Sequence, residues 1–180
     1  MINGAWEPLA DGAWRFHGKT FSDERGESWE AFDLCSADLP ISFVALQENV
    51  IRTLRAGCAR GLHYQLGAAA QAKLVTVLGG RAQVFWVALS CPAEQPIVHS
   101  AILTSPNETI YTPGTCAHGV LALENETVFS LRMSRAVDLA RRGEINLLSS
   151  QLRLSPATSI LPDLLSKRDR DAPDWSSRRL

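Results

Sequence analysis

The middle of the sequence consists of short apolar runs that are rich in β-branched and aromatic residues and are separated by turn residues. Such runs occupy residues 40–50, 73–90, 96–105, 108–114 and 119–134. Each run is typical of a strand or of two strands joined by a turn. Closely spaced strands with little helical pattern between them favour a sandwich or barrel over βαβ units. The sequence therefore predicts an all-β fold, with one domain over residues 1–180.

Two connections in this region carry turn signals. Gly79 and Gly80 separate the two halves of 73–90, and glycine accepts the positive φ of a two-residue hairpin turn. We therefore expect these two halves to pair with each other. Residues 124–126 (ENE) provide a turn between the two strands of 119–134.

Helical pattern is scarce and is confined to the C-terminal region 157–180. Residues 159–169 predict one short helix, because three leucines share one face (Leu161, Leu164 and Leu165). Residues 174–180 are polar enough to predict a fraying tail.

The charge balance argues against a polyanionic partner. The chain has 18 Lys and Arg against 19 Asp and Glu, so no field favours nucleic acid or an anionic membrane. A bound anion must be held by a local cluster of cations. No segment has the ~18 consecutive apolar residues of a membrane span, and residues 1–19 lack the apolar run of a signal peptide. The four cysteines form no CxxC pair, so we expect a cytoplasmic protein with reduced thiols.

Residues 57–75 combine cations, amides and an imidazole within a mostly apolar stretch. On an alternating strand, His63 and Gln65 share one face, while Leu62 and Tyr64 share the other. If Leu62 and Tyr64 pack between sheets, His63 and Gln65 point into a polar cavity or toward solvent.

The polar residues of this segment suit proton transfer. A neutral imidazole such as His63 removes a proton near physiological pH without a large pKa shift. Arg60 and Lys73 would clamp a phosphate or stabilise a developing oxyanion; a solvated, partly charged sheet face is the alternative. His118 follows a Pro-Gly turn and should be held in place. Cys116 lies two residues earlier, but we interpret it as packing because no acid partner is evident.

The sequence does not support a metal site. Many small β-barrels hold a metal with a His-x-His pair, a Glu and a distant His, but neither a second His nor a Glu follows His63 within ten residues. His118 alone cannot complete three ligands. The motifs GxGxxG, GxxxxGK and GxSxG are also absent, so no phosphate loop or nucleophile elbow is expected.

Several segments together resemble one known family. They are FSDERGESWE (21–30), FVALQENV (43–50), RGLHYQ (60–65), AQAKLV (70–75), TPGTCAHGV (112–120) and LPDLLSKRDRDAP (161–173). Their order and spacing resemble the F-x-D-x-R-G, F-V-Q-D-N, R-G-L-H-F-Q…Q-G-K-L-V, I-P-x-G-F-A-H-G-F and S-x-K-D…A-P motifs of the dTDP-4-dehydrorhamnose 3,5-epimerases. The resemblance covers most of the chain and implies that family's cupin-type jelly-roll β-barrel or sandwich.

The resemblance also implies an activity. Family enzymes act on a nucleotide-linked 4-keto-6-deoxyhexose and invert C3 and C5, whose protons are acidified by the C4 ketone. They use no metal or organic cofactor, and they supply deoxysugars for surface polysaccharides or glycosylated natural products. The residue that matches His63 is the base. The positions that match the family's substrate site are Arg25, Glu30, Gln47, Asn49, Arg60, Lys73 and His118.

Family enzymes are usually homodimers in which N-terminal strands cross between subunits. The resemblance therefore implies that the N-terminal strand region 1–40 is exchanged in a dimer, and that Arg25 serves the partner's site.

Deprotonation next to the ketone leaves an enolate, which Arg60 or Lys73 would stabilise. Inversion then requires an acid across the cavity from the base.

Four positions depart from the family pattern. The tyrosine that donates the proton corresponds to Leu131, and a leucine cannot donate one. An acidic residue corresponds to Val84, the aspartate that orients the base falls near Ser149, and the tyrosine that stacks on thymine corresponds to Val137. Without its carboxylate, His63 would be a weaker and less fixed base. Without the stacking ring, nucleotide preference would be relaxed or altered.

The identity of the proton donor and the extent of catalysis stay open at this stage. Tyr64 is expected to face away from the site, and Tyr111 could approach the cavity rim, but nothing places it opposite His63. Cys116 and water remain as donors. One hypothesis is an isomerase with restricted chemistry, such as epimerisation at one carbon only or return of the proton by water. The other is a protein that binds a nucleotide sugar, or assists a partner enzyme, without turnover.

Overall fold

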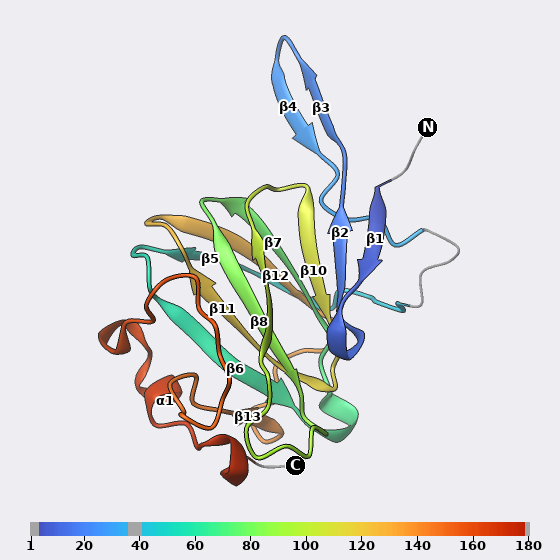
Figure 1. Cartoon of the computed structure of the whole chain (residues 1–180). Coiled ribbons are helices and arrows are strands. Elements are labelled where there is room, and N and C mark those ends of the chain that lie inside the picture. Colours follow the sequence, from blue (N-terminus) through green and yellow to red (C-terminus); the bar gives the residue numbers. More distant parts are fainter. Residues whose placement is uncertain (1–3, 36–40, 179–180) are drawn as a thin grey trace.

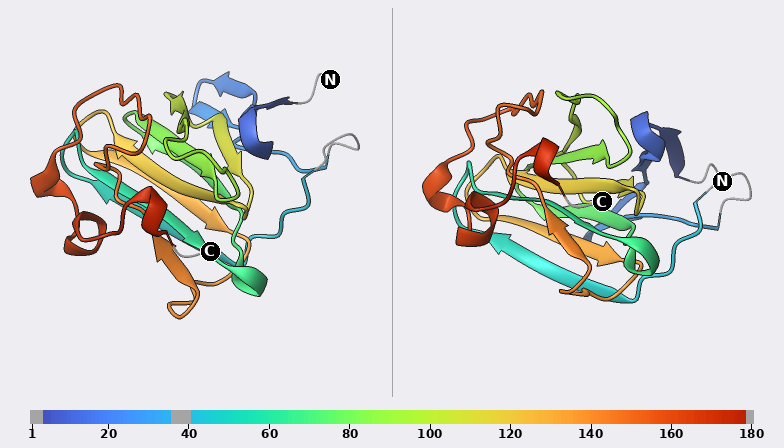
Figure 2. Two further views of the ribbon diagram at one scale, coloured as in Figure 1. Left: turned by 60° about the horizontal axis from the view of Figure 1, so that its bottom comes forward. Right: turned by 90° about the horizontal axis from the view of Figure 1, so that it is seen from below.

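The computed structural model describes residues 4–35 and 41–178, and the predicted all-β fold is confirmed there. Two antiparallel sheets pack face to face, and a hairpin stands away from them (Figures 1 and 2). Sheet I has the strand order β1-β2-β10-β7-β12-β5, and sheet II has the order β13-β6-β11-β8-β9. Three stretches that belong to sequence predictions lie outside the described residues: 1–3, 36–40 and 179–180.

The strands of sheet I are β1 (Ala5–Pro8), β2 (Trp14–His17), β5 (Gln47–Thr53), β7 (Lys73–Gly79), β10 (Glu108–Thr112) and β12 (Thr127–Met133). Those of sheet II are β6 (Ala59–Gln65), β8 (Ala82–Ala88), β9 (His99–Leu103), β11 (Cys116–Ala122) and β13 (Arg142–Glu144). The hairpin consists of β3 (Thr20–Asp23) and β4 (Gly26–Trp29), and the 3₁₀ turns η1 (Ala10–Gly12) and η2 (Gly67–Ala69) connect strands. From β5 onward the chain passes repeatedly from one sheet to the other, as in a jelly roll.

The predicted pairing of the two halves of 73–90 is wrong. β7 pairs with β10 and β12, whereas β8 pairs with β11 and β9, so the turn at Gly79–Gly80 carries the chain between sheets. Gly80 does adopt a positive φ of 75°. Both strands are buried on both faces over most of their length, so the alternation that identifies a pairing partner is missing.

The remaining strand predictions differ in detail. The turn at 124–126 is confirmed and joins β11 to β12, which again lie in different sheets. The predicted strand 40–50 begins only at Gln47 and continues to Thr53, where β5 forms an edge of sheet I beside β12.

The single helix predicted over 159–169 is wrong. The segment contains a 3₁₀ turn, η3 (Pro162–Leu164), and a short helix, α1 (Lys167–Arg170). Leu165 and Ser166 between them are extended, with ψ of 146° and 154°, so the helical pattern of the leucines is interrupted. Ser166 then acts as the N-cap of α1, because its hydroxyl accepts a hydrogen bond from the Asp169 N–H.

The prediction of a fraying tail is also wrong over its described part. Trp175, in η4 (Trp175–Ser177), is 1% exposed, and its indole N–H donates a hydrogen bond to the Ala93 carbonyl at 2.9 Å. The Arg178 guanidinium lies 3.6 Å from the centre of the Trp175 ring and donates to the Cys91 carbonyl. One tryptophan thus anchors a segment whose other residues are polar.

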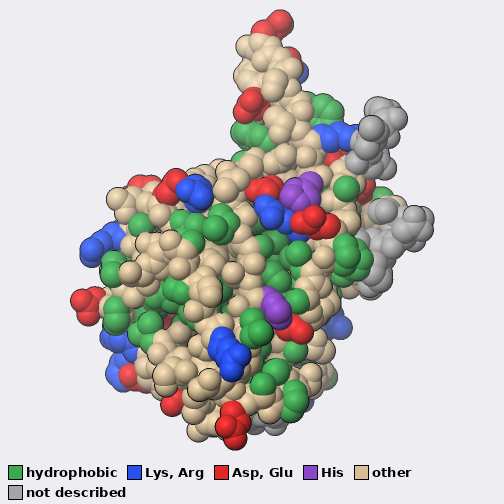
Figure 3. Space-filling view, in the orientation of Figure 1, with side chains coloured by type: hydrophobic (Ala, Val, Ile, Leu, Met, Phe, Trp, Pro, Cys, Tyr) green, Lys and Arg blue, Asp and Glu red, His purple; other side chains and the backbone are tan. Residues whose placement is uncertain are grey.

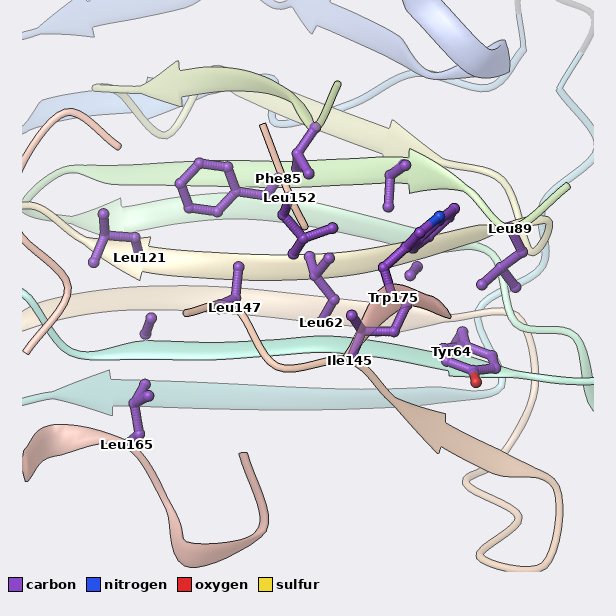
Figure 4. Close-up of a cluster of buried hydrophobic side chains, with 14 residues drawn as sticks. Leu62, Tyr64, Phe85, Leu89, Leu121, Ile145, Leu147, Leu152, Leu165 and Trp175 are labelled. Atoms are coloured by element: carbon purple, nitrogen blue, oxygen red, sulfur yellow. The ribbon is translucent and has the colours of Figure 1, made fainter. Parts of the chain in front are cut away.

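Two apolar clusters determine where a cavity can form. Figure 4 shows the first, in which the Leu62 and Tyr64 side chains of sheet II pack against Ile145, Leu147 and Trp175 from the C-terminal segment. The second cluster lies between the sheets and contains, among others, Val75, Val77, Ile110 and Phe129 of sheet I and Val84, Trp86 and Val120 of sheet II. The expected packing of Leu62 and Tyr64 between the sheets is therefore wrong, because both lie on the face of sheet II that the C-terminal segment covers. This packing still directs His63 to the opposite face of β6, where it lines the cavity as predicted.

The surface agrees with the near-neutral charge. Acidic and basic side chains are interspersed on the face shown in Figure 3, and the β3–β4 hairpin projects from it. Within residues 4–35 and 41–178, no helix has the length and apolar character needed to cross a bilayer.

Candidate active site

A cavity of about 300 Å³ lies between the sheets, next to the second apolar cluster. Sheet I contributes mainly apolar side chains to its wall, together with Asn49 and Lys73. Polar side chains come from sheet II and the C-terminal segment. The polar and charged residues that line the cavity are Asn49, Arg60, His63, Gln65, Gln71, Lys73, His118, Arg142, Ser166 and Asp169. The cavity therefore places several cations and one carboxylate around a histidine.

His63 is paired with a carboxylate. Its Nε2 lies 2.6 Å from Oδ1 of Asp169 in α1. The Ser166 hydroxyl donates to Oδ2 of Asp169 at 2.9 Å, so both carboxylate oxygens are engaged. The expectation that the orienting aspartate is lost near Ser149 is therefore wrong. Ser149 is buried and does not line the cavity, and Asp169 fills this role from the end of the chain.

The electrostatics of the pair favour a neutral base. Burial lowers the pKa of His63, and the hydrogen bond that His63 donates to Asp169 offsets part of that shift. Burial works against ionisation of Asp169, but the hydrogen bond and charge of His63 outweigh it and lower its pKa. An ionised Asp169 accepts a hydrogen bond from Nε2–H, so the proton stays on Nε2 and the lone pair of His63 lies on Nδ1. A neutral imidazole with a fixed tautomer can remove a proton from a ligand in the cavity.

Lys73 provides a buried ammonium. The residue is 5% exposed, and its Nζ donates to the main-chain carbonyl of His63 at 3.1 Å. Burial and the nearby Arg142 guanidinium lower the pKa of Lys73 to about 7. Arg60 also lines the cavity, so three cations surround the space beside His63. Such a cluster suits a ligand with an anionic group or a developing negative charge.

His118 lies directly across from His63 in the ladder between β11 and β6. Its Nδ1 is 3.4 Å from the Thr112 hydroxyl. Burial, together with the charges of Lys73 and His63, lowers the pKa of His118 well below its usual value. His118 is therefore a neutral hydrogen-bonding group at pH 7.

The structure brings together five of the eight residues predicted from the sequence: Asn49, Arg60, His63, Lys73 and His118. Gln47 lies just outside the cavity lining, where its amide nitrogen is 3.3 Å from Asn49 and its carbonyl oxygen accepts from the Val137 N–H. The roles of all these residues in substrate binding stay predictions.

Arg25 and Glu30 do not reach the cavity of their own chain. Arg25 lies in the turn of the projecting hairpin, where its side chain is 85% exposed and pairs with Asp23. Glu30 follows β4, and its Oε2 is buried without a hydrogen-bond partner among the described residues. Both residues belong to the region 1–40, which the family resemblance predicts to be exchanged in a dimer, and the service of Arg25 to a partner's site stays a prediction.

The departures from the family pattern have different structural outcomes. Leu131 and Val137 line the cavity, whereas Val84 packs in the second apolar cluster. The Tyr64 side chain packs in the first apolar cluster on the other side of sheet II (Figure 4), although Tyr64 is also among the residues that line the cavity. The Tyr111 ring packs edge-on against Phe43 and is outside the cavity lining.

Cys116 is a packing residue, as predicted. It is 3% exposed within the second apolar cluster. Burial, with a contribution from Asp11, raises the pKa of its thiol to about 12. Its thiol is therefore a poor proton donor or nucleophile.

Asp169, Ser166 and Arg142 were missed by the sequence interpretation. The first two belong to the SKRD run within 161–173, which matches the closing S-x-K-D motif, so the signal was present but the aspartate was aligned elsewhere. Arg142 begins β13, opposite Gln65 of β6, and has no motif around it. Only the sheet pairing could bring Arg142 to the cavity.

A jelly-roll sandwich with a carboxylate-paired histidine and buried cations around a cavity is the arrangement of a proton-abstracting isomerase. Residues 9–177 match the dTDP-4-dehydrorhamnose 3,5-epimerase family, and the chain belongs to that family. It is an epimerase by class, and the alternative of binding without turnover is not favoured.

Individual relatives support the same family over most of the chain. The dTDP-4-dehydrorhamnose 3,5-epimerase of Streptomyces griseus is 28% identical over 169 residues, which cover 92% of this chain and 84% of that protein. The crystal structure of the Elizabethkingia anophelis dTDP-4-dehydrorhamnose 3,5-epimerase is 26% identical, with a TM-score of 0.82 over 97% of this chain and 98% of its own. A 3'-monoepimerase from Streptomyces bikiniensis, solved with dTDP-quinovose, is 27% identical, with a TM-score of 0.84 over 94% and 87%.

Proposed function

We propose that this protein epimerises a dTDP-4-keto-6-deoxyhexose by removing the proton from C3, C5 or both. The observation that carries the proposal is the His63–Asp169 pair, 2.6 Å apart, on the wall of the cavity between the sheets. The pair supplies a neutral base with a fixed tautomer, which proton abstraction next to a ketone requires. Arg60 and Lys73 supply positive charge for the enolate oxygen.

The substitution at Leu131 supports a restricted reaction. Inversion at two carbons needs a donor that serves both positions, and the family's tyrosine is absent here. One of the solved relatives, from Streptomyces bikiniensis, is a 3'-monoepimerase. We therefore infer inversion at a single carbon, in the supply of a deoxysugar for a polysaccharide or a natural product.

The test follows isotope exchange at each carbon. Wild-type protein is incubated with dTDP-4-keto-6-deoxyglucose in D₂O, and the C3–H and C5–H signals are followed by NMR. We expect deuterium at one of the two positions and a new epimer. Binding of the sugar nucleotide without exchange at either carbon would contradict the proposed reaction, and the absence of binding would contradict the substrate.

We further infer a cytoplasmic homodimer that uses no metal or organic cofactor. Support for the dimer comes from exposed apolar side chains on the β5 edge and the hairpin, including Val50 at 64%, Phe21 at 57% and Trp29 at 43%. Large exposed apolar groups of this kind mark interaction surfaces. The exposed Arg25 then lies on an element that can reach the partner's cavity.

Subunit exchange gives a direct test of the role of Arg25. If Arg25 serves the partner, a heterodimer of Arg25→Ala and His63→Asn chains contains one intact site. Differently tagged variants are co-expressed, and purified heterodimer is compared with each homodimer. The purified heterodimer should recover about half of the wild-type activity, because one of its two sites is intact, whereas each homodimer stays impaired. No recovery in the heterodimer would mean that Arg25 acts in its own subunit or not at all.

A further inference from the structure

Arg142 is a cation of the cavity wall whose hydrogen-bond donors are unused. Its side chain is 21% exposed and lines the cavity between the sheets. Its Nε lies 2.7 Å from Oε1 of Glu144, yet both atoms are buried without a hydrogen-bond partner among the described residues, so the contact is an ion pair without hydrogen-bond geometry. Within residues 4–35 and 41–178, no group accepts a hydrogen bond from this guanidinium. Mostly buried donors are normally satisfied, which indicates that a ligand oxygen binds here.

The charge of Arg142 is only partly neutralised. Oε1 of Glu144 is also 2.7 Å from Nε of Arg168 in α1. One carboxylate thus serves two guanidinium groups, and a net positive charge remains beside the cavity. An anionic oxygen is the ligand group that such a charge favours.

The ladder between β13 and β6 places Arg142 beside the base. Glu144 lies opposite His63, and Arg142 lies opposite Gln65. Residues two apart on a strand share a face, so Arg142 and His63 are diagonal neighbours on the cavity face of sheet II, with Cβ atoms about 7 Å apart. The electrostatics agree with this proximity. Burial is the main cause of the lowered pKa of His63 and of Lys73, and the charge of Arg142 contributes to both.

A ketone next to the reacting carbon would lie close to this cation. The carbon that loses its proton must lie about 3 Å from Nδ1 of His63. C3 and C5 are both bonded to C4, so the C4 oxygen is attached to the neighbouring carbon whichever of the two reacts. That oxygen projects from the edge of the ring rather than from the face opposite the base. Cations beside His63 are therefore well placed for it.

We propose that Arg142 is a catalytic residue that donates hydrogen bonds to the C4 oxygen of the 4-keto sugar and stabilises the enolate. This inference rests on the proposed epimerase function and deepens it by adding a residue that the family motifs do not include. His63 removes the proton from carbon, the electron pair of the C–H bond forms a C=C bond to C4, and the π electrons of the ketone move to its oxygen. Arg142 keeps its own protons throughout, and return of a proton to carbon re-forms the ketone.

Arg142 adds a constant charge that the other two cations of the cavity do not supply. Burial and Arg142 lower the pKa of Lys73 to about 7, so a large share of its amine is neutral near pH 7. Arg60 lines the same cavity but is exposed, and water screens its charge. An arginine stays protonated at physiological pH, and in a mostly buried position its charge acts at a lower effective dielectric constant.

Two substitutions of Arg142 test the role. Arg142→Gln removes the charge, whereas Arg142→Lys keeps a charge without the fork of donors. Glu144 still pairs with Arg168 in both variants, so β13 and α1 should stay linked. With dTDP-4-keto-6-deoxyglucose in D₂O at saturating substrate, we expect exchange at the reacting carbon to slow by at least ~10²-fold in Arg142→Gln and by about tenfold in Arg142→Lys.

Binding of dTDP separates this role from nucleotide recognition. Because dTDP has no ketone, its affinity, measured by calorimetry, should stay within about threefold of wild type in both variants. Arg141→Gln is the matched control, because Arg141 is half-exposed and pairs with Asp138 outside the cavity lining. That control should exchange at the wild-type rate and bind dTDP normally.

The contrary outcomes are distinct. A loss of dTDP affinity of about tenfold or more in both variants would assign Arg142 to the diphosphate or to the fold, and would overturn the inference. Wild-type exchange that Arg142→Gln retains would overturn the inference alone. If wild-type protein shows no exchange, the proposed function fails and the inference falls with it.

Discussion

His63→Asn is expected to abolish deuterium exchange at the reacting carbon, with a loss of at least ~10³-fold in rate. Asparagine is neutral, of similar size and unable to accept a proton from carbon at any physiological pH. Asp169 loses its bond to Nε2 of His63 but still accepts a hydrogen bond from the Ser166 hydroxyl at 2.9 Å, so the local fold should persist. The affinity for dTDP should stay within about threefold of wild type, because the base contributes little to ground-state binding.

The measurement is the initial rate of C–H loss in D₂O at saturating substrate, with dTDP binding followed by calorimetry. His17→Asn is the matched control, because His17 is 46% exposed on β2, pairs with Glu7 and lies outside the cavity lining. We expect that control to exchange at the wild-type rate. Exchange in His63→Asn within tenfold of wild type would assign the base to another group.

The orientation of His63 followed from local sequence, because strands have a strict period of two. Leu62 and Tyr64 are large and apolar, and their packing against the C-terminal segment necessarily directs His63 to the other face (Figure 4). The same logic failed at Gly79–Gly80. There the flanking strands are buried on both faces, so sequence alone could not distinguish a hairpin from a crossover between sheets.

The partners of His63 were harder to predict because they are distant in sequence. Asp169 lies 106 positions from His63, and α1 reaches the cavity only because Ser166 caps it and Leu165 packs beside it. Arg142 arrives through the short pairing of β13 with β6. Motif resemblance supplied the base and most cations, whereas the carboxylate and the third cation required the three-dimensional pairing.

Asp169→Asn is expected to lower the exchange rate by about 10²- to 10³-fold without unfolding the protein. Asp169 accepts a hydrogen bond from Nε2–H of His63. An asparagine amide can instead donate a hydrogen bond to Nε2, which would move the ring proton to Nδ1. Nδ1 would then have no lone pair with which to deprotonate the substrate. Asp169 also raises the pKa of His63 against the larger effect of burial. Without it the pKa falls further, so the imidazole is a weaker base.

The sign of the pH effect provides the sharpest check on this substitution. The rate requires neutral His63, so the acid limb of kcat/KM lies below pH 6.5 in wild type, and it should move to still lower pH in Asp169→Asn. Asp171→Asn is the matched control on the same segment, since Asp171 is 58% exposed and pairs with Lys167. An acid limb that moved upward, or an equal loss of rate in Asp171→Asn, would mean that Asp169 supports the fold of α1 rather than the basicity of His63.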